Sequence, residues 1–274
     1  MANYTAADIK EIRESTGAGM LDVKKALDEA NGDKVKAVEL IRVKGLKGIA
    51  KREGRTASEG LIAVDIRDTE GGQTGTLVEL NSETDFVAKN DKFVALGDEA
   101  VAAAVESGAS EPEDLASTPF GEALTNAGAT MGEKILVRRI GRVSGEAVSS
   151  YMHRTNKDLP PQVGVLVATD KAGAEVARDI AMHIAAFTPA YLSRDEVPAD
   201  QVADERRIAE ETAKNEGKPE KAIQKIIEGR LNGFFKENCL LDQAFAKDPK
   251  KSVGKVVEEA GGTITGFVRF RVGS

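Results

Sequence analysis

Apolar side chains recur at helical spacing in three short runs between residues 5 and 45. The apolar positions are Ile9 and Ile12 in the first run, Met20, Val23, Leu27 and Ala30 in the second, and Val35, Val38 and Ile41 in the third. Thr5 and Asp33 can cap the first and third runs, while Gly17-Ala18-Gly19 and Asn31-Gly32 end the first and second. The pattern predicts a small bundle of three helices.

A basic stretch follows the bundle and completes the first predicted unit, residues 1–55. Its charged positions are Arg42, Lys44, Lys47, Lys51, Arg52 and Arg55, and they are interrupted by Gly45, Gly48 and Gly54. Runs of like charge are usually solvated, so we favour a linker loosened by its glycines. The alternative is a basic surface that contacts an acidic patch on a partner.

From Gly60 onward the pattern changes to strands and helices, which predicts a second unit over residues 56–144. Its expected strands are residues 61–66, 76–81 and 134–140, and its expected helices run from Asp91 to about Glu106 and onward from Pro119. The first two strands form a hairpin around a glycine-rich turn. After the second strand, Thr84 or Asp85 can cap a short helix whose first turn holds Phe86, and Asp91 can cap the next helix.

A similar order of elements recurs in the rest of the chain. The expected elements are strands at 147–153 and 163–168, a helix with Val176, Ile180, Ile184 and Phe187 on one face, and a last strand at 263–272. We interpret this recurrence as a weak internal duplication. The second copy is predicted to be discontinuous, covering residues 145–192 and 238–274.

Residues 193–237 interrupt the second copy with a long, highly charged helical stretch. Its apolar positions are Val202, Ile208, Ala209 and Thr212 before a break at Gly217-Lys218-Pro219, and Ala222, Ile223, Ile226, Ile227, Leu231 and Phe234 after it. Two helices joined by a short turn form an antiparallel hairpin. Because the first segment is charged almost all round, we expect this hairpin to project from the core.

Composition limits the class of protein. Of the 274 residues, 41% are hydrophobic and 30% charged, which is ordinary for a soluble globular protein. The net charge of −7 disfavours a surface that broadly coats nucleic acid. No apolar segment approaches the ~18 residues of a membrane span, and the first residues lack the apolar region of a signal peptide. With the single cysteine, Cys239, these features predict a cytoplasmic protein without an internal disulfide.

No residue pattern indicates catalysis or cofactor binding. The chain has no Gly-x-x-x-x-Gly-Lys-Ser/Thr loop, and Gly17-Ala18-Gly19 lacks a third spaced glycine and follows a helix, so neither phosphate-binding fingerprint is present. His183 lies among apolar helix positions and is interpreted as a core or boundary histidine. Cys239 is too isolated to indicate a metal site. A Cys–His nucleophilic pair stays open, but nothing positive supports an enzyme, a metal site or a cofactor.

Two short motifs indicate a family. Thr84-Asp85-Phe86-Val87 and, near the start, Thr16-Gly17-Ala18-Gly19-Met20 resemble the signatures of bacterial elongation factor Ts, the guanine-nucleotide exchange factor of elongation factor Tu. They stand in the family's order and spacing, and the similarity covers nearly the whole chain. The resemblance implies an α+β fold: an N-terminal bundle of the ubiquitin-associated type, a core of two related α/β subdomains, and a coiled-coil hairpin inserted in the second.

The resemblance also implies which residues contact the partner. In the family the second motif enters the GTPase domain of elongation factor Tu near its magnesium site, so Phe86 is the expected hydrophobic wedge. The partner-binding residues implied are Thr84, Asp85, Phe86 and Val87, with secondary contacts from Gly17, Gly19, Met20 and His153. The alternative for Phe86 is a place in the core, which is the commoner fate of phenylalanine, and Met20 serves either role equally well.

The leading hypothesis is an exchange factor that acts by binding elongation factor Tu and disturbing its Mg²⁺ and phosphate site, without a cofactor, nucleic acid or membrane. The first alternative is a ubiquitin-associated-like or nucleic-acid-binding adaptor built on residues 5–55, and the second is an α/β enzyme with an unrecognised site. Many family members continue past the last strand with a further helical module, whereas this sequence ends at Val272-Gly273-Ser274. We therefore expect the bundle and core to carry more of the contact. Self-association is left open.

Overall fold

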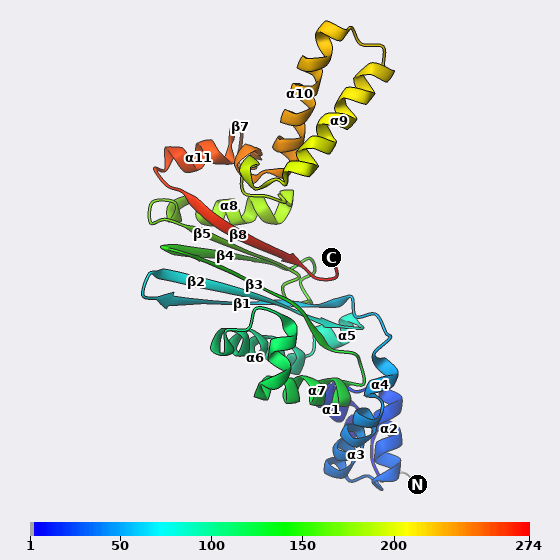
Figure 1. Ribbon diagram of the computed structural model, residues 1–274. Helices are drawn as coiled ribbons and strands as arrows, with labels where there is room; N and C mark the ends of the chain where they lie inside the picture. Colours follow the sequence, from blue (N-terminus) through cyan, green and yellow to red (C-terminus); the bar gives the residue numbers. More distant parts are fainter. Residues whose placement is uncertain (1–2) are drawn as a thin grey trace.

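The centre of the molecule is a stack of four layers in the order helix, sheet, sheet, helix (Figure 1). The computed structural model describes residues 3–274, apart from the side chains at positions 49 and 50. A helical bundle at the N-terminus adjoins one end of the stack, and a helical hairpin projects from the opposite side. The architecture is mixed α and β with N-terminal helices, as the sequence predicts. None of the helices in the described part of the chain is long and apolar enough to cross a membrane.

Three helices form the N-terminal bundle, as predicted. They are α1 (Ala6–Thr16), α2 (Met20–Glu29) and α3 (Lys34–Lys47). Thr5 and Asp33 cap α1 and α3 through their side chains, which confirms both predicted caps. Val35 was expected to face inward and is instead 80% exposed, because the inner face of α3 passes through Ala37 and Ile41.

The basic stretch after the bundle is largely helical, so the prediction of a loosened linker is wrong for most of it. The helix α3 continues through Lys47, and α4 (Ile49–Arg52) follows after one residue. Only residues 53–58 then connect α4 to the first strand. The helical conformation persists because α3 packs along its length on a helix of the core.

This packing explains a glycine in the interior of α3. A Cβ added at Gly45 would stand 1.7 Å from the carbonyl oxygen of Ala129, which belongs to α7 (Pro119–Met131). The two helix backbones touch at this point, so only glycine fits. Arg42 reinforces the contact by donating a hydrogen bond to Oδ1 of Asn126 at 3.0 Å. The bundle is therefore docked on the core through a close helix–helix contact.

The first sheet contains three antiparallel strands in the order β1-β2-β3. Its strands are β1 (Glu59–Thr69), β2 (Gly72–Ser82) and β3 (Leu136–Gly145), and the elements between β2 and β3 are α5 (Asp85–Ala88), α6 (Asp91–Ser107), η1 (Pro112–Ser117) and α7. The predicted hairpin of β1 and β2 is confirmed and is longer than expected. The helices α6 and α7 cover the outer face of this sheet, where Leu80 and Phe93 are fully buried (Figure 1).

The second sheet has the strand order β4-β5-β8. Its strands are β4 (Ala147–His153), β5 (Val163–Thr169) and β8 (Ile264–Arg271), and the nearby elements are α8 (Ala174–Phe187), η2 (Arg194–Glu196), η3 (Leu240–Asp242), β6 (Ala244–Phe245), β7 (Asp248–Ser252) and α11 (Val253–Glu259). Helix α8 and helix α11 lie on its outer face. In both sheets the second strand in chain order is central, so the two share one strand order. That they derive from a duplication stays a prediction.

The two sheets pack face to face through an apolar layer. Its buried residues are Ile62, Leu77, Val148, Leu166, Ala168 and Phe270. The sheets approach so closely that a Cβ added at Gly164 would lie 2.5 Å from Cγ2 of Ile62. Burial of this apolar layer joins the two sheets into one core.

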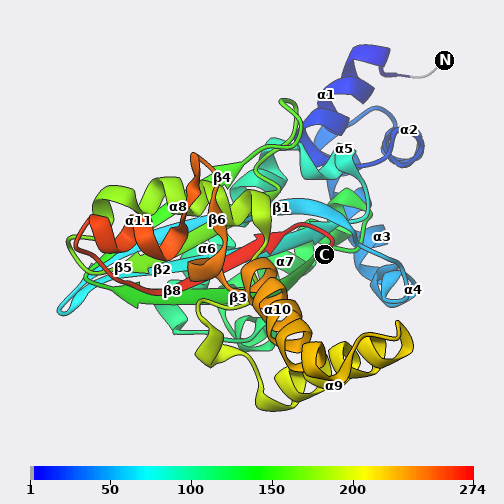
Figure 2. The ribbon, with the colours of Figure 1, turned by 90° about the horizontal axis from the view of Figure 1, so that it is seen from above.

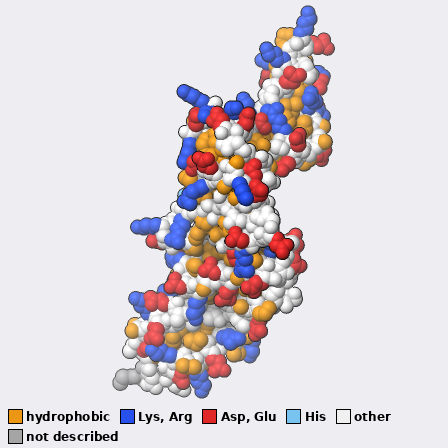
Figure 3. Space-filling model, turned by 90° about the vertical axis from the view of Figure 1, so that its left-hand side faces the viewer, with side chains coloured by type: hydrophobic (Ala, Val, Ile, Leu, Met, Phe, Trp, Pro, Cys, Tyr) orange, Lys and Arg blue, Asp and Glu red, His pale blue; other side chains and the backbone are white. Residues whose placement is uncertain are grey.

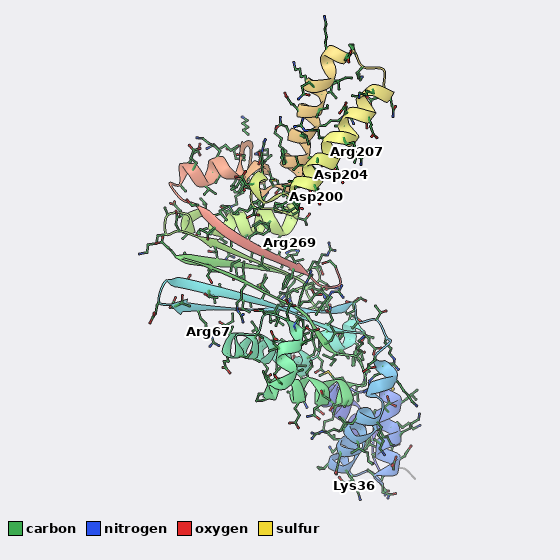
Figure 4. The ribbon with its side chains drawn as sticks, viewed as in Figure 1. Lys36, Arg67, Asp200, Asp204, Arg207 and Arg269 are labelled. Atoms are coloured by element: carbon green, nitrogen blue, oxygen red, sulfur yellow. The ribbon has the colours of Figure 1, made fainter. Side chains whose placement is uncertain are left out.

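The projecting hairpin consists of α9 (Ala199–Asn215) and α10 (Glu220–Asn238). Its seam is narrow, and the buried residues are Ala209, Ala213, Ile227 and Leu231. Ile208 was expected in this seam but is 47% exposed, because the buried face of α9 passes through alanines one turn apart. The rest of α9 is charged, and Figure 4 shows Asp204 and Arg207, which form an ion pair at 3.3 Å, along its length.

Candidate functional site

A single turn of helix, α5, presents the Thr84-Asp85-Phe86-Val87 motif just after β2. Thr84 caps this turn, because its hydroxyl oxygen accepts a hydrogen bond from the N–H of Val87 at 3.3 Å. Val87 is 1% exposed and packs in the core beneath the first sheet. Its burial holds the turn in place, while Asp85 is exposed and Phe86 is partly buried.

The segment before α5 is fastened to the connection between α7 and β3. The carboxylate of Glu133 accepts hydrogen bonds from the N–H groups of Glu83 at 3.0 Å and Thr84 at 3.1 Å, and from the Thr84 hydroxyl at 2.5 Å. Burial raises the pKa of Glu133, and the hydrogen bonds from Thr84 and Glu83 oppose that rise. One side chain therefore makes three bonds to the segment that carries α5.

Phe86 lies against the N-terminal bundle. The guanidinium carbon of Arg13, in α1, lies 4.1 Å from the centre of the Phe86 ring, which is a cation–π contact. Close by, Asn90 donates a side-chain hydrogen bond to the carbonyl oxygen of Glu14 at 3.3 Å. Asn90 also caps α6, one residue before the predicted cap at Asp91. These contacts place the end of α1 beside α5, as Figure 2 shows from above.

The glycine motif of the bundle lies at the same junction. Gly17 ends α1 with a φ of +74°, and a Cβ added there would lie 3.0 Å from Cγ of Met131 in α7. Glycine therefore both permits the left-handed turn and lets the bundle approach the core. Helix α2 begins three residues later at Met20, whose side chain is 58% exposed.

An apolar groove of about 430 Å³ lies where the two motifs meet. Its lining residues are Ala6, Ile9, Lys10, Arg13, Glu14, Met20 and Phe86. Met20 comes from the first motif and Phe86 from the second, although they are far apart in the sequence. An exposed apolar surface with charged residues at its edge is typical of sites that bind other proteins.

The structure thus brings together residues of both predicted motifs. Asp85 is exposed on α5 and pairs with Lys89 at 3.3 Å. Gly19 is exposed immediately before Met20, whereas Gly17 is buried at the junction. The side chain of Val87 faces the core in this conformation, so its contribution to a contact surface is to anchor the turn.

His153 is not part of the groove. It lies at the end of β4 in the second sheet, where it is exposed and its Nδ1 is 3.1 Å from the Tyr151 hydroxyl. The sequence alone could not place this residue relative to α5, because α5 follows a strand of the first sheet and His153 ends a strand of the second.

Two residues of the site were missed by the sequence analysis. Arg13 carried a usable signal, because it stands four residues after Ile9 on one face of a predicted helix and one turn before the first motif. Glu133 carried none, because it reaches Thr84 across 49 residues of sequence. Long-range pairing of this kind depends on the tertiary fold.

His183 and Cys239 are both buried. His183 is 1% exposed, and burial lowers its pKa. Its Nδ1 accepts the N–H of Ala246 at 3.2 Å, so Nε2 carries the proton and donates it to Oε1 of Gln243 at 2.8 Å. This confirms the interpretation of His183 as a satisfied core histidine. Cys239 is fully buried, and among residues 3–274 no group of three His, Cys, Asp or Glu side chains could hold a metal ion.

Charge is mixed on the face of the molecule shown in Figure 3. Acidic and basic side chains alternate there from the bundle to the tip of the helical hairpin. A protein that binds nucleic acid through its backbone concentrates positive charge in a patch or stripe. With a net charge of −7, this face gives no support to a nucleic-acid adaptor.

Comparison with known proteins gives one consistent result. The family model described as Elongation factor TS matches residues 83–274, which include α5. A protein named elongation factor Ts from Beutenbergia cavernae is 65% identical over 100% of both chains. Proteins of the same name from Micrococcus luteus and an Arthrobacter species are each 60% identical, again over 100% of both chains. The full-length matches therefore extend over the bundle as well.

Proposed function

The chain belongs to the elongation factor Ts family, and we propose that it is the guanine-nucleotide exchange factor of elongation factor Tu. Membership in the family gives it a role in translation elongation. In the proposed reaction it binds elongation factor Tu carrying GDP, promotes release of the GDP and so allows GTP to bind. It acts by binding, in the cytoplasm with its partner, and makes or breaks no covalent bond.

One observation carries the proposal: Phe86 on α5 and Met20 on α2 line the same groove. Each comes from one of the two family motifs, and the cation–π contact between Arg13 in α1 and Phe86 in α5 joins the bundle, which carries Met20, to the core. A wedge can act on the partner only if a second surface of the protein binds the partner next to the wedge. The junction of bundle and core supplies both surfaces at one place.

We propose that Asp85 and Phe86 enter the GTPase domain near the bound Mg²⁺ and the phosphates. The Phe86 ring separates groups that hold the ion, and Asp85 contacts the partner beside it. Thr84 and Val87 act indirectly, because one caps the turn and the other anchors it in the core. A turn held this rigidly can push against the partner instead of yielding to it.

The thermodynamic requirement is a coupling between two ligands of elongation factor Tu. An exchange factor must bind the nucleotide-free GTPase more tightly than the GDP-bound form. By reciprocity, the same free energy then weakens GDP binding in the complex. A rigid wedge meets this requirement, because it fits the partner only after the magnesium site has opened.

We also propose a role for each unit of the chain from its position in the fold. Residues 1–55 anchor the partner through Met20 and the backbone around Gly19. Residues 56–144 carry the wedge, and the discontinuous unit of residues 145–192 and 238–274 offers a secondary contact at His153. The hairpin of residues 193–237 projects away from the groove.

Stopped-flow release of fluorescent GDP from elongation factor Tu tests the proposal. The chain is mixed with the loaded GTPase in excess unlabelled GDP, and the release rate should rise with chain concentration and then saturate. Less than one chain per GTPase molecule should be enough to release all of the fluorescent GDP, because each chain dissociates after an exchange and acts again. A release rate that stays at its spontaneous value at every concentration would reject the exchange function. Salt-dependent RNA binding by the same preparation would favour the adaptor instead.

A further inference from the structure

Two glutamates hold the wedge segment and the α7–β3 connection together reciprocally. Glu133 accepts three hydrogen bonds from Glu83 and Thr84, as described above. In return, Glu83 accepts the backbone N–H of Lys134 at 2.6 Å. Each segment thus supplies a carboxylate to the other's backbone. Bonds from N–H groups to a carboxylate are shorter and stronger than bonds between neutral groups.

Glu83 and Lys134 also hold the segment that connects the bundle to the first strand. The ammonium of Lys134 donates to the carbonyl oxygens of Glu53 at 2.5 Å and Arg55 at 3.1 Å. The guanidinium of Arg55 in turn pairs with the carboxylate of Glu83 at 3.2 Å. Residues 53–55, which follow the bundle, and residues 83–84, which precede α5, are therefore held next to each other.

The surroundings of Glu133 disfavour its charged form relative to its neutral form. Burial raises its pKa and the neighbouring carboxylate of Glu83 raises it further, so the hydrogen bonds of Thr84 and Glu83 do not fully compensate. Glu133 also lines a cavity of about 200 Å³ together with Arg52, Glu53 and Lys134. A partly buried carboxylate that is disfavoured in its charged form at a functional surface is more often retained for function than for stability.

We propose that Glu133 is a positioning residue for the exchange reaction, holding Glu83 and Thr84 so that Phe86 is presented in a fixed orientation beside the bundle. This inference rests on the proposed function. Glu133 touches no partner itself, because its carboxylate is directed to the backbone of the wedge segment. Its effect reaches the partner only through Phe86.

If Glu133 had a purely structural role, its variants would show a different pattern of effects. If Glu133 only stabilised the fold, its loss would lower the melting temperature and leave the folded fraction fully active. If it positions the wedge, its loss slows exchange by the folded protein, and the effect disappears when Phe86 is already absent. A double-mutant cycle separates the two cases.

The variants are Glu133→Ala, Glu133→Gln and Phe86→Ala, the double variant of Glu133→Ala with Phe86→Ala, and Glu122→Ala as control. Glu122 is an exposed carboxylate in the first turn of α7. Stopped-flow GDP release is measured for each, together with thermal unfolding and hydrogen exchange of the Glu83 and Thr84 amides. Glu133→Gln also guards against misfolding of the alanine variant, because its amide oxygen can still accept both backbone N–H bonds.

We expect Glu133→Ala to slow stimulated GDP release about tenfold and to increase amide exchange at Glu83 and Thr84. Glu133→Gln should recover most of the rate, Glu122→Ala should match wild type, and Glu133→Ala should add nothing to Phe86→Ala. Wild-type rates in folded Glu133→Ala, or additive losses in the double variant, would overturn the inference while leaving the exchange function intact. A wild-type chain that fails to release GDP would overturn the exchange function, and this inference with it.

Discussion

The guanidinium of Arg13 lies over the ring of Phe86, with 4.1 Å between its central carbon and the ring centre. Arg13 belongs to the bundle and Phe86 to the core, so this contact joins the two parts at the candidate site. The Nε atom of Arg13 is buried and has no hydrogen-bond partner among the described residues. Among the described residues, the Phe86 ring is therefore the main contact of the Arg13 guanidinium.

The Arg13–Phe86 contact should be measurable as a coupling free energy. Arg13→Ala, Phe86→Ala and the double variant would be unfolded with denaturant, and the cycle should give a coupling of about 0.5–1 kcal/mol. Arg13→Lys keeps the positive charge and should retain part of this coupling. A value indistinguishable from zero would mean that the two side chains are neighbours without energetic consequence.

Met20 should contribute to affinity without contributing much to stability. Its side chain is 58% exposed, so Met20→Ala should change the free energy of unfolding by less than about 0.5 kcal/mol. If Met20 anchors elongation factor Tu, the variant should weaken the complex by about 1–2 kcal/mol, or roughly fivefold to thirtyfold. Calorimetric titration with elongation factor Tu measures this.

Val35→Ala is the matched control, because Val35 is 80% exposed on the same bundle. Its neighbour Lys36 lies at the end of the molecule remote from α5 (Figure 4). Equal losses of affinity in the two variants would show that the groove is not the anchoring surface.

Docking of the bundle should depend on Gly45. Alanine is favoured over glycine in a helix interior by about 1 kcal/mol, so Gly45→Ala would be stabilising if α3 were free. Because the added Cβ would stand 1.7 Å from the Ala129 carbonyl oxygen, we expect a net loss of about 1–3 kcal/mol. Gly54→Ala is the control, since a Cβ there meets no atom within 4 Å. Denaturant unfolding that finds both variants equally stable would contradict the close contact of α3 with α7.

His183 should make stability depend on pH. Burial lowers its pKa in the folded state, whereas the unfolded chain titrates near the ordinary value of 6.5. The unfolded state therefore takes up a proton first, and the stability from this group, complete above 6.5, is lost as the pH falls through the lower folded pKa. His183→Gln should flatten the decline of unfolding free energy between about pH 7.5 and pH 5.5. Parallel curves for variant and wild type would contradict the assignment.

Local features of this protein were predictable from sequence. The cap at Thr84, one of two candidates, and the helix from Asp91 to about Glu106 depend on residues within a few turns, and both are observed. The strands of the first hairpin were found for the same reason, because alternation and a glycine-rich turn are local signals. Phe86 and Met20 were identified as candidates from the family motifs. The hydrophobic pattern alone allowed both side chains to lie in the core.

Features that depend on packing between distant segments were not predictable. Val35 was assigned inward because its spacing suits a helix face, but Ala37 packs inside the bundle and Gly45 docks on α7. The same docking turns the expected linker into helix. Neither the contact of Arg13 with Phe86 nor the bonds from Glu133 could be inferred, because each joins segments that meet only after the core has formed.

Phe86→Ala tests the central claim most directly, by pairing thermal unfolding with stopped-flow GDP release from elongation factor Tu. Because Phe86 is only partly buried, the loss of stability should stay below the ~3–5 kcal/mol typical of a core phenylalanine. Ile180→Val, in the buried core beside the second sheet, provides a variant that is destabilised away from the cluster on which Phe86 packs. The wedge account predicts that folded Phe86→Ala stimulates release roughly thirtyfold more slowly, a loss of ~2 kcal/mol, while folded Ile180→Val keeps the wild-type rate. Wild-type exchange by folded Phe86→Ala would return Phe86 to a structural role and contradict the account.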